Sequence, residues 1–528
     1  MNGVLLGLLV VSVAVFLRLA ISLHPYSGAG KPPLYGDYEA QRHWMEITFN
    51  TPLSQWYHDT PGNNLLYWGL DYPPLTAYHS WLCGAVANRI NSAWVALTTS
   101  RGHESSEHKL FMRYSVLMVD VLVFFSGVAL FVRALFSLFL GQRKQKVDKE
   151  SQSILNSKLA LLILLQPGLL LIDYGHFQYN AASLGLVLWG IVGVITDHNL
   201  LGSIAFSLAL NYKQMELYHA LPFFFYLLGK SFQGQTKHEK ERRSKTTISL
   251  RGVFNVLKIG FVVLLTFAVL WFPFFQARGI EGVLQVARRL FPFNRGLFED
   301  KVANFWCSVS VLVKVRQKIS QGTLVFVSGG LTLMAALPSS LYLLWYPRAY
   351  NFLLALVTSS LSFFLFSFQV HEKSILLACL PMSLLTAHHP FLATTFQLTA
   401  AFSMYPLLTQ DQLCLAVWAL CCLYSLLSVL FLDRTNTEMP LMESKVKVLV
   451  LFLLSTLLTL CTLSHLLRPP PSLPHIFPLL ISVVSFIQFL GYLIYFSYLT
   501  LTGGHRGPPP LGVRGCKEYL YGNKTHTN

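Results

Sequence analysis

One aspartate in this chain stands out as a side chain that could accept a proton. Asp71 lies in Trp68-Gly69-Leu70-Asp71-Tyr72-Pro73-Pro74, within a hydrophilic stretch that follows the first apolar segment. The prolines hold the residue before them extended and suit the first turn of a following helix, whose N-terminus favours an ionised carboxylate. Asp71 is therefore a candidate general base, although an aspartate that only caps a turn would show the same local pattern.

A second acidic group occurs earlier, in Gly36-Asp37-Tyr38-Glu39-Ala40-Gln41-Arg42-His43-Trp44. Asp37 and Glu39 could hold a metal ion, or one of them could act as the base. They could also simply pair with Arg42 and His43 along one face of a helix. The spacing leaves all three roles open.

Further polar residues interrupt apolar segments later in the chain. They are His176 and Gln178 in Gly175-His176-Phe177-Gln178-Tyr179-Asn180, Lys213 and Gln214, and His371 and Lys373 in His371-Glu372-Lys373-Ser374. Placing an ionisable side chain inside the membrane costs free energy, so such residues are usually kept for function. Each of these residues is therefore a functional candidate, unless it lies at a helix end and reaches the membrane interface.

The segment 287–300 interleaves basic and aromatic residues between two apolar stretches. Arg288, Arg289 and Arg295 could clamp a phosphate, and the aromatic rings could line a lipid or sugar path. An interfacial helix with ordinary aromatic anchors would give the same pattern.

The high hydrophobic content of the chain indicates that membrane helices hold these residues in place. Of the 528 residues, 53% are hydrophobic and 12% are charged, against about 25% charged in soluble proteins. Apolar runs recur from end to end and predict an all-α, polytopic membrane protein with about 12–16 transmembrane segments. Several runs are shorter than the ~20 residues that a span needs, which indicates broken or re-entrant helices.

The charge of the loops predicts their orientation. Residues 143–158 and 230–251 have net charges of +3 and +5, whereas residues 24–109 have a net charge of −2. By the positive-inside rule the basic loops are cytosolic, and residues 24–109 and 277–303 face the opposite side. We expect one membrane domain over residues 1–528, with both chain ends cytosolic and Asn523 unglycosylated. The net charge of +16 is spread over short loops and does not indicate nucleic-acid binding.

The motifs resemble those of a known family. Ser27 to Pro33, Gly36 to Trp44, Trp68 to Ser80, Gly175 to Asn180 and His371 to Ser374 are similar to segments of the dolichyl-phosphate-glucose-dependent glucosyltransferases of the endoplasmic reticulum. The resemblance runs from about residue 20 to residue 500 and is most specific in the first loop. It implies a GT-C fold, in which a multi-span helical enzyme of the endoplasmic reticulum membrane carries its active site on the lumenal side.

The resemblance also implies a reaction. Glucose would pass with inversion, and without a metal ion or other cofactor, from dolichyl β-D-glucosyl phosphate to the lipid-linked oligosaccharide Man9GlcNAc2-PP-dolichol. Asp71 would be the catalytic base and His371 a donor-phosphate contact, with Lys373, Arg289 and Arg295 as further candidates. The remaining candidates for substrate binding are Asp37, Glu39, Arg42, His43, Tyr72, His176 and Gln178.

Three other functions fit part of the pattern. The family member that adds the second glucose shares the Asp-Tyr-Pro-Pro core, and a mannosyltransferase of the same fold would need the same chemistry. A lipid or sugar transporter would also carry ionisable residues in broken helices. A transporter, however, concentrates them at the midplane of two related halves, whereas this chain concentrates them in its first loop and has no detectable repeat.

Overall fold

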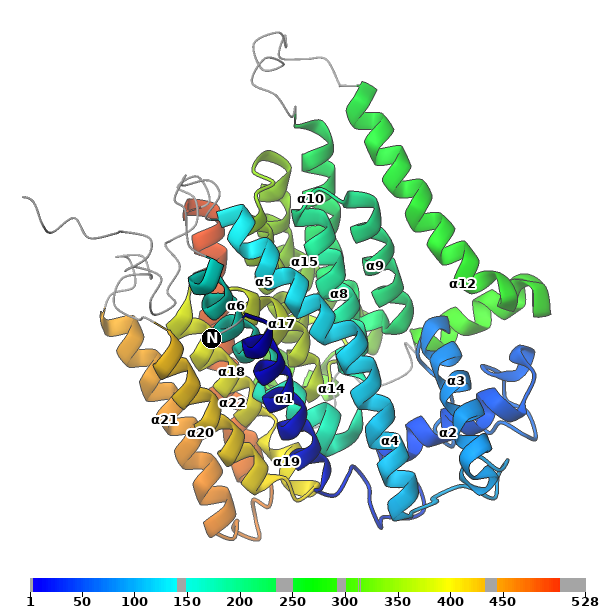
Figure 1. Cartoon of the computed structure of the whole chain (residues 1–528). Helices are drawn as coiled ribbons and strands as arrows, with labels where there is room; N and C mark the ends of the chain where they lie inside the picture. Colours follow the sequence, from blue (N-terminus) through cyan, green and yellow to red (C-terminus); the bar gives the residue numbers. More distant parts are fainter. Residues whose placement is uncertain are drawn as a thin grey trace, which may run out of the picture.

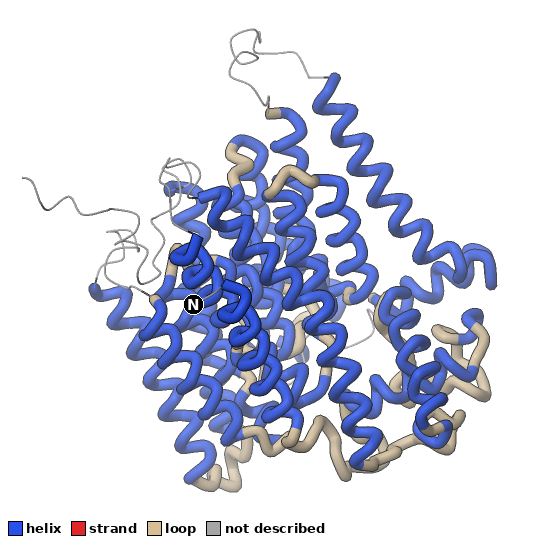
Figure 2. The backbone as a smooth tube through the Cα atoms, in the orientation of Figure 1, coloured by secondary structure: helices blue, strands red, loops and turns tan. Residues whose placement is uncertain are grey.

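The computed structural model describes residues 3–139, 149–233, 250–291, 301–311, 313, 315–432 and 444–503. Within these ranges the chain forms helices and connecting loops and no β-sheet, so the all-α prediction is confirmed. Most helices run alongside one another in a bundle (Figures 1 and 2). The first loop, with helices α2 (Asp37–Asn50) and α3 (Pro74–Ile90), lies beside one end of that bundle.

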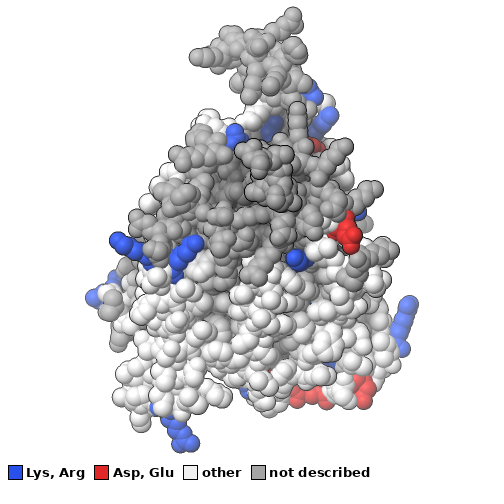
Figure 3. Space-filling view, turned by 60° about the vertical axis from the view of Figure 1, so that its left-hand side comes forward, with Lys and Arg blue, Asp and Glu red and all other residues white. Residues whose placement is uncertain are grey.

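Eight helical segments in the described ranges are long and apolar enough to cross a membrane. They are α1 (Gly3–Ser22), Ser106–Leu135 (formed by α4, Ser106–Val119; η3, Asp120–Phe125; and much of α5, Ser126–Phe139), α12 (Leu250–Leu290), α15 (Gln321–Trp345), α16 (Ala349–Phe366), α20 (Cys414–Phe431), α21 (Ser444–Leu466) and α22 (Ile476–Gly503). A broad band of the face shown in Figure 3 carries few charged side chains, as expected of helices that contact lipid. The chain is a multi-pass membrane protein.

The number of candidate spans in the described part of the chain becomes nine if α6 (Lys149–Leu164) and the helix Pro167–Phe177, bent by 50°, are taken as one broken span. This is fewer than the expected 12–16, because several apolar segments form helices of only 9 to 16 residues. These are α8 (Asn180–Ile195), α9 (Asn199–Tyr212), α10 (Ala220–Phe232), α17 (Leu376–Leu384) and α18 (Pro390–Ser403). Helices this short are tolerated in a membrane where protein covers them, and α17 and α18 are almost wholly buried.

Short helical turns join these elements. They are η1 (Leu53–Gln55), η2 (Ser92–Trp94), α7 (Pro167–Leu170), η5 (Leu171–Phe177), η6 (Gln214–His219), α13 (Phe305–Ser310), α14 (Val315–Lys318), η7 (Glu372–Ile375) and α19 (Tyr405–Gln410).

A buried ion pair links three helices in the bundle. Nε of Arg18 in α1 donates to Oδ2 of Asp120 in η3 at 2.6 Å, and both side chains are fully buried. The hydroxyl of Tyr174 in η5 donates to the same carboxylate at 2.7 Å. Charged groups are retained in such an environment only when they are paired. The pair and the Tyr174 hydrogen bond thus hold η5, which contains the first residues of the polar segment 175–180.

Helix α12 bends sharply after it leaves the bundle. Arg278 and Gly279 have non-helical backbone angles, and Gly279 has a φ of +60°, which glycine adopts without steric cost. The bend turns residues 280–290 back toward the first loop (Figure 1). Leu290 then packs in a small core with Trp44, Tyr57 and Leu70. The expected second loop, 277–303, is therefore partly helical, and its residues 292–300 lie outside the described residues.

The helices of the first loop and the helix ends that flank the basic segment 230–251 lie in different parts of the molecule. Helix α10 ends and α12 begins at the top of Figure 1, whereas α2 and α3 lie toward the lower right. The end of α10 and the start of α12 therefore lie at the end of the molecule opposite to the first loop.

Candidate active site

A cavity of about 930 Å³ opens where the first loop meets the bundle. Its walls come from α2 and residues 65–72 of the first loop, the start of α8, η6, the end of α12, and residues 363–377. The predicted site residues that line it are Asp37, Asp71, Tyr72, Gln178, Arg289, His371 and Lys373. Segments more than 300 residues apart in the sequence therefore form one site.

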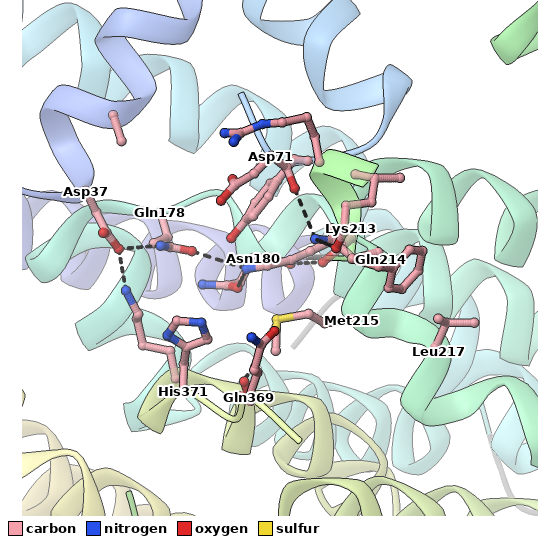
Figure 4. Close-up of a pocket in the computed structure, with 18 of the residues that line it drawn as sticks. Asp37, Asp71, Gln178, Asn180, Lys213, Gln214, Met215, Leu217, Gln369 and His371 are labelled. Carbon is pink, nitrogen blue, oxygen red and sulfur yellow. Dashed lines mark hydrogen bonds and ion pairs between the residues drawn. The ribbon is translucent and has the colours of Figure 1, made fainter. Parts of the chain in front are cut away.

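Asp71 lies on the wall formed by the first loop, half-buried. Figure 4 shows it above the cavity, with His371 and Gln369 on the opposite side. Its backbone leads directly into α3, which begins at Pro74 as predicted. Trp68 and Gln369 have positive φ angles of 50° and 58°. Such backbone strain persists where surrounding structure enforces it, often at functional sites.

Asp37 and Lys373 form an ion pair at the edge of the cavity. Gln178 also donates to Oδ2 of Asp37, and Nε2 of His176 lies 3.0 Å from the same oxygen. Burial disfavours the charged form of Asp37, but the charge of Lys373 and the contact with His176 outweigh it and hold its pKa well below the ordinary value. Asp37 is thus ionised and a weak base.

His176 lies behind Asp37 and does not line the cavity. Its Nδ1 is 2.6 Å from Oδ2 of Asp411, and its Nε2 faces Asp37 and, at 3.2 Å, Nζ of Lys373. The imidazole is buried between the two carboxylates. It therefore supports the Asp37–Lys373 pair from behind.

Lys213, a functional candidate from sequence to which no particular role was given, forms part of the cavity wall. Its Nζ donates to Gln178 at 3.2 Å and to Asn180 at 2.6 Å, and it lies 5.2 Å from the ring centre of Tyr72. The dashed lines of Figure 4 trace this chain from Asp37 through Gln178 to Lys213. The interruption of an apolar run by Lys213 and Gln214 was the available signal.

The structure does not bring Glu39, Arg42 and His43 to the cavity. The guanidinium of Arg42 binds Glu39 at 2.6 Å and Glu46 at 2.7 Å, and His43 lies 3.1 Å from Glu46. All four side chains are buried. Of the roles that the sequence left open, these contacts fit a structural ion-pair network, because no side chain in it faces the cavity.

Arg289 lines the cavity, but it donates to backbone carbonyls of the first loop, at 2.8 Å to Gly69 and 3.1 Å to Leu70. Gly69 must be small here: a Cβ would lie 2.7 Å from Cα of Leu65 and 2.9 Å from Nη2 of Arg289. Arg288 is exposed and pairs with Glu281. Arg295 lies outside the described residues.

Within the described residues, no three His, Cys, Asp or Glu side chains are grouped so that they could hold a metal ion. Asp37 and Glu39, the pair that could have bound one, face different partners. Lys373 neutralises Asp37, and Arg42 neutralises Glu39.

The fold and the site define a multi-pass, all-helical membrane protein with a charged cavity beside its first loop. Comparison with known proteins narrows this class: the chain matches the ALG6, ALG8 glycosyltransferase family over residues 14–495, and it belongs to that family. The resemblance of its motifs is thereby confirmed.

Relatives from distant organisms cover nearly the whole chain. Dolichyl pyrophosphate Man9GlcNAc2 alpha-1,3-glucosyltransferase of Gallus gallus is 48% identical over 493 residues, covering 89% of this chain and 92% of that protein. The protein of the same name from Mus musculus is 47% identical over 500 residues, with the same coverage. A probable enzyme of this name from Dictyostelium discoideum is 42% identical, covering 90% of this chain and 91% of that protein.

Proposed function

We propose that this glycosyltransferase transfers glucose from dolichyl β-D-glucosyl phosphate to the 3-hydroxyl of a mannose on Man9GlcNAc2-PP-dolichol. The names of its relatives support the acceptor and the α-1,3 linkage. The product is Glc1Man9GlcNAc2-PP-dolichol, a precursor for protein N-glycosylation.

One observation carries the mechanism: Asp71, His371 and Lys373 line the same cavity. The mannose hydroxyl attacks the anomeric carbon from the face opposite the phosphate, and its proton passes to Asp71 as the new bond forms. The bond between the anomeric carbon and the phosphate oxygen breaks, and its electron pair leaves with dolichyl phosphate. Attack from the opposite face converts the β-linked donor into an α-linked product.

The leaving phosphate needs charge stabilisation rather than a proton, because it is a weak base. Among the described residues of the cavity wall, the cations Lys213, Arg289 and Lys373 outnumber the carboxylates Asp37 and Asp71. In this mechanism His371 and Lys373 bind the phosphate of the donor, with Lys213 adding positive charge nearby. Tyr72 and Gln178 also line the cavity and are proposed as contacts to the sugars.

Asp37 is not proposed as the base because its carboxylate is already neutralised by a lysine. Asp37 pairs with Lys373, and its pKa lies well below the ordinary value, so it has little tendency to take a proton at neutral pH. Asp37 instead holds Lys373 at the cavity edge, with His176 behind it.

Part of the cavity suits the polyprenyl chain of the donor. Its apolar lining comes from η6, α8, α15, α16, α17 and the segment after α16, and includes Leu184, Leu217, Val325, Phe363, Phe368 and Leu376. An isoprenoid chain entering from the membrane would meet these side chains, while its phosphate reached the cations at the polar end.

We place the protein in the endoplasmic reticulum membrane with residues 24–109 and 277–303 facing the lumen. The net charge of −2 in the first loop, against +5 in residues 230–251, supports this orientation. The helix ends Phe232 and Leu250, which flank the part of residues 230–251 that the structure does not describe, lie at the end of the molecule opposite to the first loop, and this supports the orientation as well.

The reaction is tested with the purified full-length protein and synthetic lipids. We expect transfer from dolichyl glucosyl phosphate to Man9GlcNAc2-PP-dolichol and little from dolichyl mannosyl phosphate. Preference for an acceptor that already carries one glucose would instead identify the second glucosyltransferase activity. Use of the mannose donor would identify a mannosyltransferase. Movement of the lipids across vesicles without transfer would indicate a transporter.

A further inference from the structure

The backbone that carries Asp71 is held by side chains from four separate parts of the chain. We call residues 68–72 the Asp71 segment. Each of its five carbonyl oxygens accepts a hydrogen bond from a side chain. The bonds are Trp44 Nε1 to Trp68 (2.8 Å), Arg289 Nη2 to Gly69 (2.8 Å), Arg289 Nε to Leu70 (3.1 Å), Gln214 Nε2 to Asp71 (3.1 Å) and Tyr57 Oη to Tyr72 (2.7 Å).

The donors are themselves fixed. Trp44 and Tyr57 are 4% and 1% exposed, and they pack in the small core that also contains Leu70 and Leu290. Gln214 donates a second time, to the carbonyl of Leu290 at 3.3 Å, so it joins the end of α12 to the Asp71 segment. Figure 4 shows the bond from Gln214 to Asp71 at the cavity wall.

Such an arrangement determines where the carboxylate lies. A segment outside helices and strands has two free dihedral angles at each residue other than proline, and the carbonyl contacts on both sides of Asp71 remove that freedom. Positional errors of about 1 Å can cost about 100-fold in rate when a reacting group must meet its partner in line. Supporting residues around a site therefore act on the rate without touching the substrate.

We propose that Tyr57, Gln214 and Arg289 are positioning residues for Asp71, and that Arg289 acts through the carbonyls of Gly69 and Leu70 rather than as a phosphate ligand. This inference rests on the proposed function of Asp71 as the base. It assigns a role to the bend in α12 as well, because residues 280–290 bring Arg289 to the Asp71 segment.

Tyr57→Phe tests the proposal with the smallest change, because only one hydroxyl is lost. We expect kcat to fall roughly five- to tenfold, as one hydrogen bond allows, with KM for both lipids unchanged. Tyr78→Phe is the matched control: the Tyr78 hydroxyl also donates to a backbone carbonyl, that of Leu270 at 2.8 Å, and both tyrosine rings contact Phe274. The control should keep its wild-type kcat.

Arg289→Lys separates positioning from phosphate binding, because lysine keeps the charge but cannot donate in a fixed fork. A lower kcat with an unchanged donor KM supports positioning. A raised donor KM with an unchanged kcat overturns it for Arg289. If Tyr57→Phe fails to fold, Gln214→Met carries the same test, since it has similar length and no donor.

The Asp71→Asn background separates the positioning role of Tyr57 from the proposed role of Asp71 as the base. In that background Tyr57→Phe should cause no further loss, because the group that it positions no longer acts as a base. A full further loss, or wild-type kcat in Tyr57→Phe alone, overturns the positioning role. Near-normal turnover of Asp71→Asn itself would instead overturn the proposed base.

Discussion

Asp71 is the side chain whose loss should slow the reaction most. Asp71→Asn keeps the shape and hydrogen-bonding capacity of the residue but removes its basicity. General-base catalysis contributes about 10²–10⁴-fold, so we expect turnover to fall at least ~100-fold while both lipids still bind. Initial rates with saturating substrates and a binding assay with each lipid measure the two quantities.

Two other carboxylates provide the comparison for Asp71. Asp197 is exposed and pairs with Lys230, so Asp197→Asn should turn over at the wild-type rate. Asp37→Asn leaves Asp71 in place and should act mainly on donor use, through Lys373. If Asp71→Asn kept near-normal turnover while Asp37→Asn lost it, the base would be Asp37.

His371 should affect the donor selectively. It precedes η7 and lines the cavity beside Lys373. A charge-assisted hydrogen bond contributes about 1.5–3 kcal/mol, so His371→Ala should lower kcat/KM for the donor about 10- to 150-fold. The acceptor KM should not change. His475→Ala, at an exposed histidine, is the control, and wild-type donor kinetics in His371→Ala would make His371 a structural residue.

Metal removal should leave the enzyme active. The proposed mechanism holds the phosphate with His371, Lys373 and the charge of Lys213, so it needs no divalent cation. We expect wild-type rates after dialysis against EDTA, with and without added Mg²⁺ or Mn²⁺. A loss of activity that either metal restores would require a new assignment of Asp37 and its neighbours as ligands.

The charged residues at the cavity could be predicted from sequence because they interrupt apolar stretches or stand in distinctive motifs of the first loop. Their partners could not be predicted, because the chain distance is too large: Lys373 pairs with Asp37 across 336 residues and Arg289 reaches Gly69 across 220. Glu39 and Arg42 show the reverse case. Their i,i+3 spacing was visible in the sequence, but only the packing of α2 shows that this pair is buried away from the cavity.

Within α2, the pairing of Glu46 should stabilise the first loop in a pH-dependent way. Its carboxylate contacts Arg42 and His43 and accepts the backbone N–H of Thr98 at 2.7 Å. Burial disfavours its charged form, but the His43 contact, the charge of Arg42 and the Thr98 bond outweigh it and lower its pKa from 4.5 to about 2.

Because the pKa of Glu46 is lower in the folded protein than in the unfolded chain, its stabilisation is present above about pH 4.5 and is lost as the pH falls toward 2. The shift corresponds to a stabilisation on the order of 3 kcal/mol. Thermal unfolding followed from about pH 6 to about pH 3 should show a steeper loss for the wild type than for Glu46→Gln. Glu281→Gln, at an exposed ion pair, should behave as the wild type, and equal slopes for all three proteins would refute the role of Glu46.

Helix bounds in the first loop were predictable because their signals are local. The helix that the spacing of Glu39 and Arg42 allowed is Asp37–Asn50, and the one expected after the two prolines is Pro74–Ile90. The number of spans was not predictable, because an apolar run of 14 residues has the same sequence pattern whether lipid or protein surrounds it. The bend at Gly279 was not predicted, because a single glycine in the partly polar segment 276–281 does not reveal its φ angle.

At the level of the whole molecule, orientation can be tested by glycosylation. An acceptor sequence introduced near residue 60 should be glycosylated in cells, because the first loop is proposed to be lumenal. One introduced near residue 240 should remain unmodified, as should native Asn523, both of which lie outside the described residues. Glycan at either of these two positions would reverse the orientation and move the cavity to the cytosolic side.

The pairing of Arg18 with Asp120 has a consequence for biogenesis. The two residues are 102 positions apart, and ribosomes add about 5–20 residues per second. Asp120 is therefore synthesised roughly 5 to 20 seconds after Arg18, the residue that it neutralises. During that interval the charge of Arg18 lacks the partner that it has in the folded protein, so burial of this face of α1 is costly until η3 has been made.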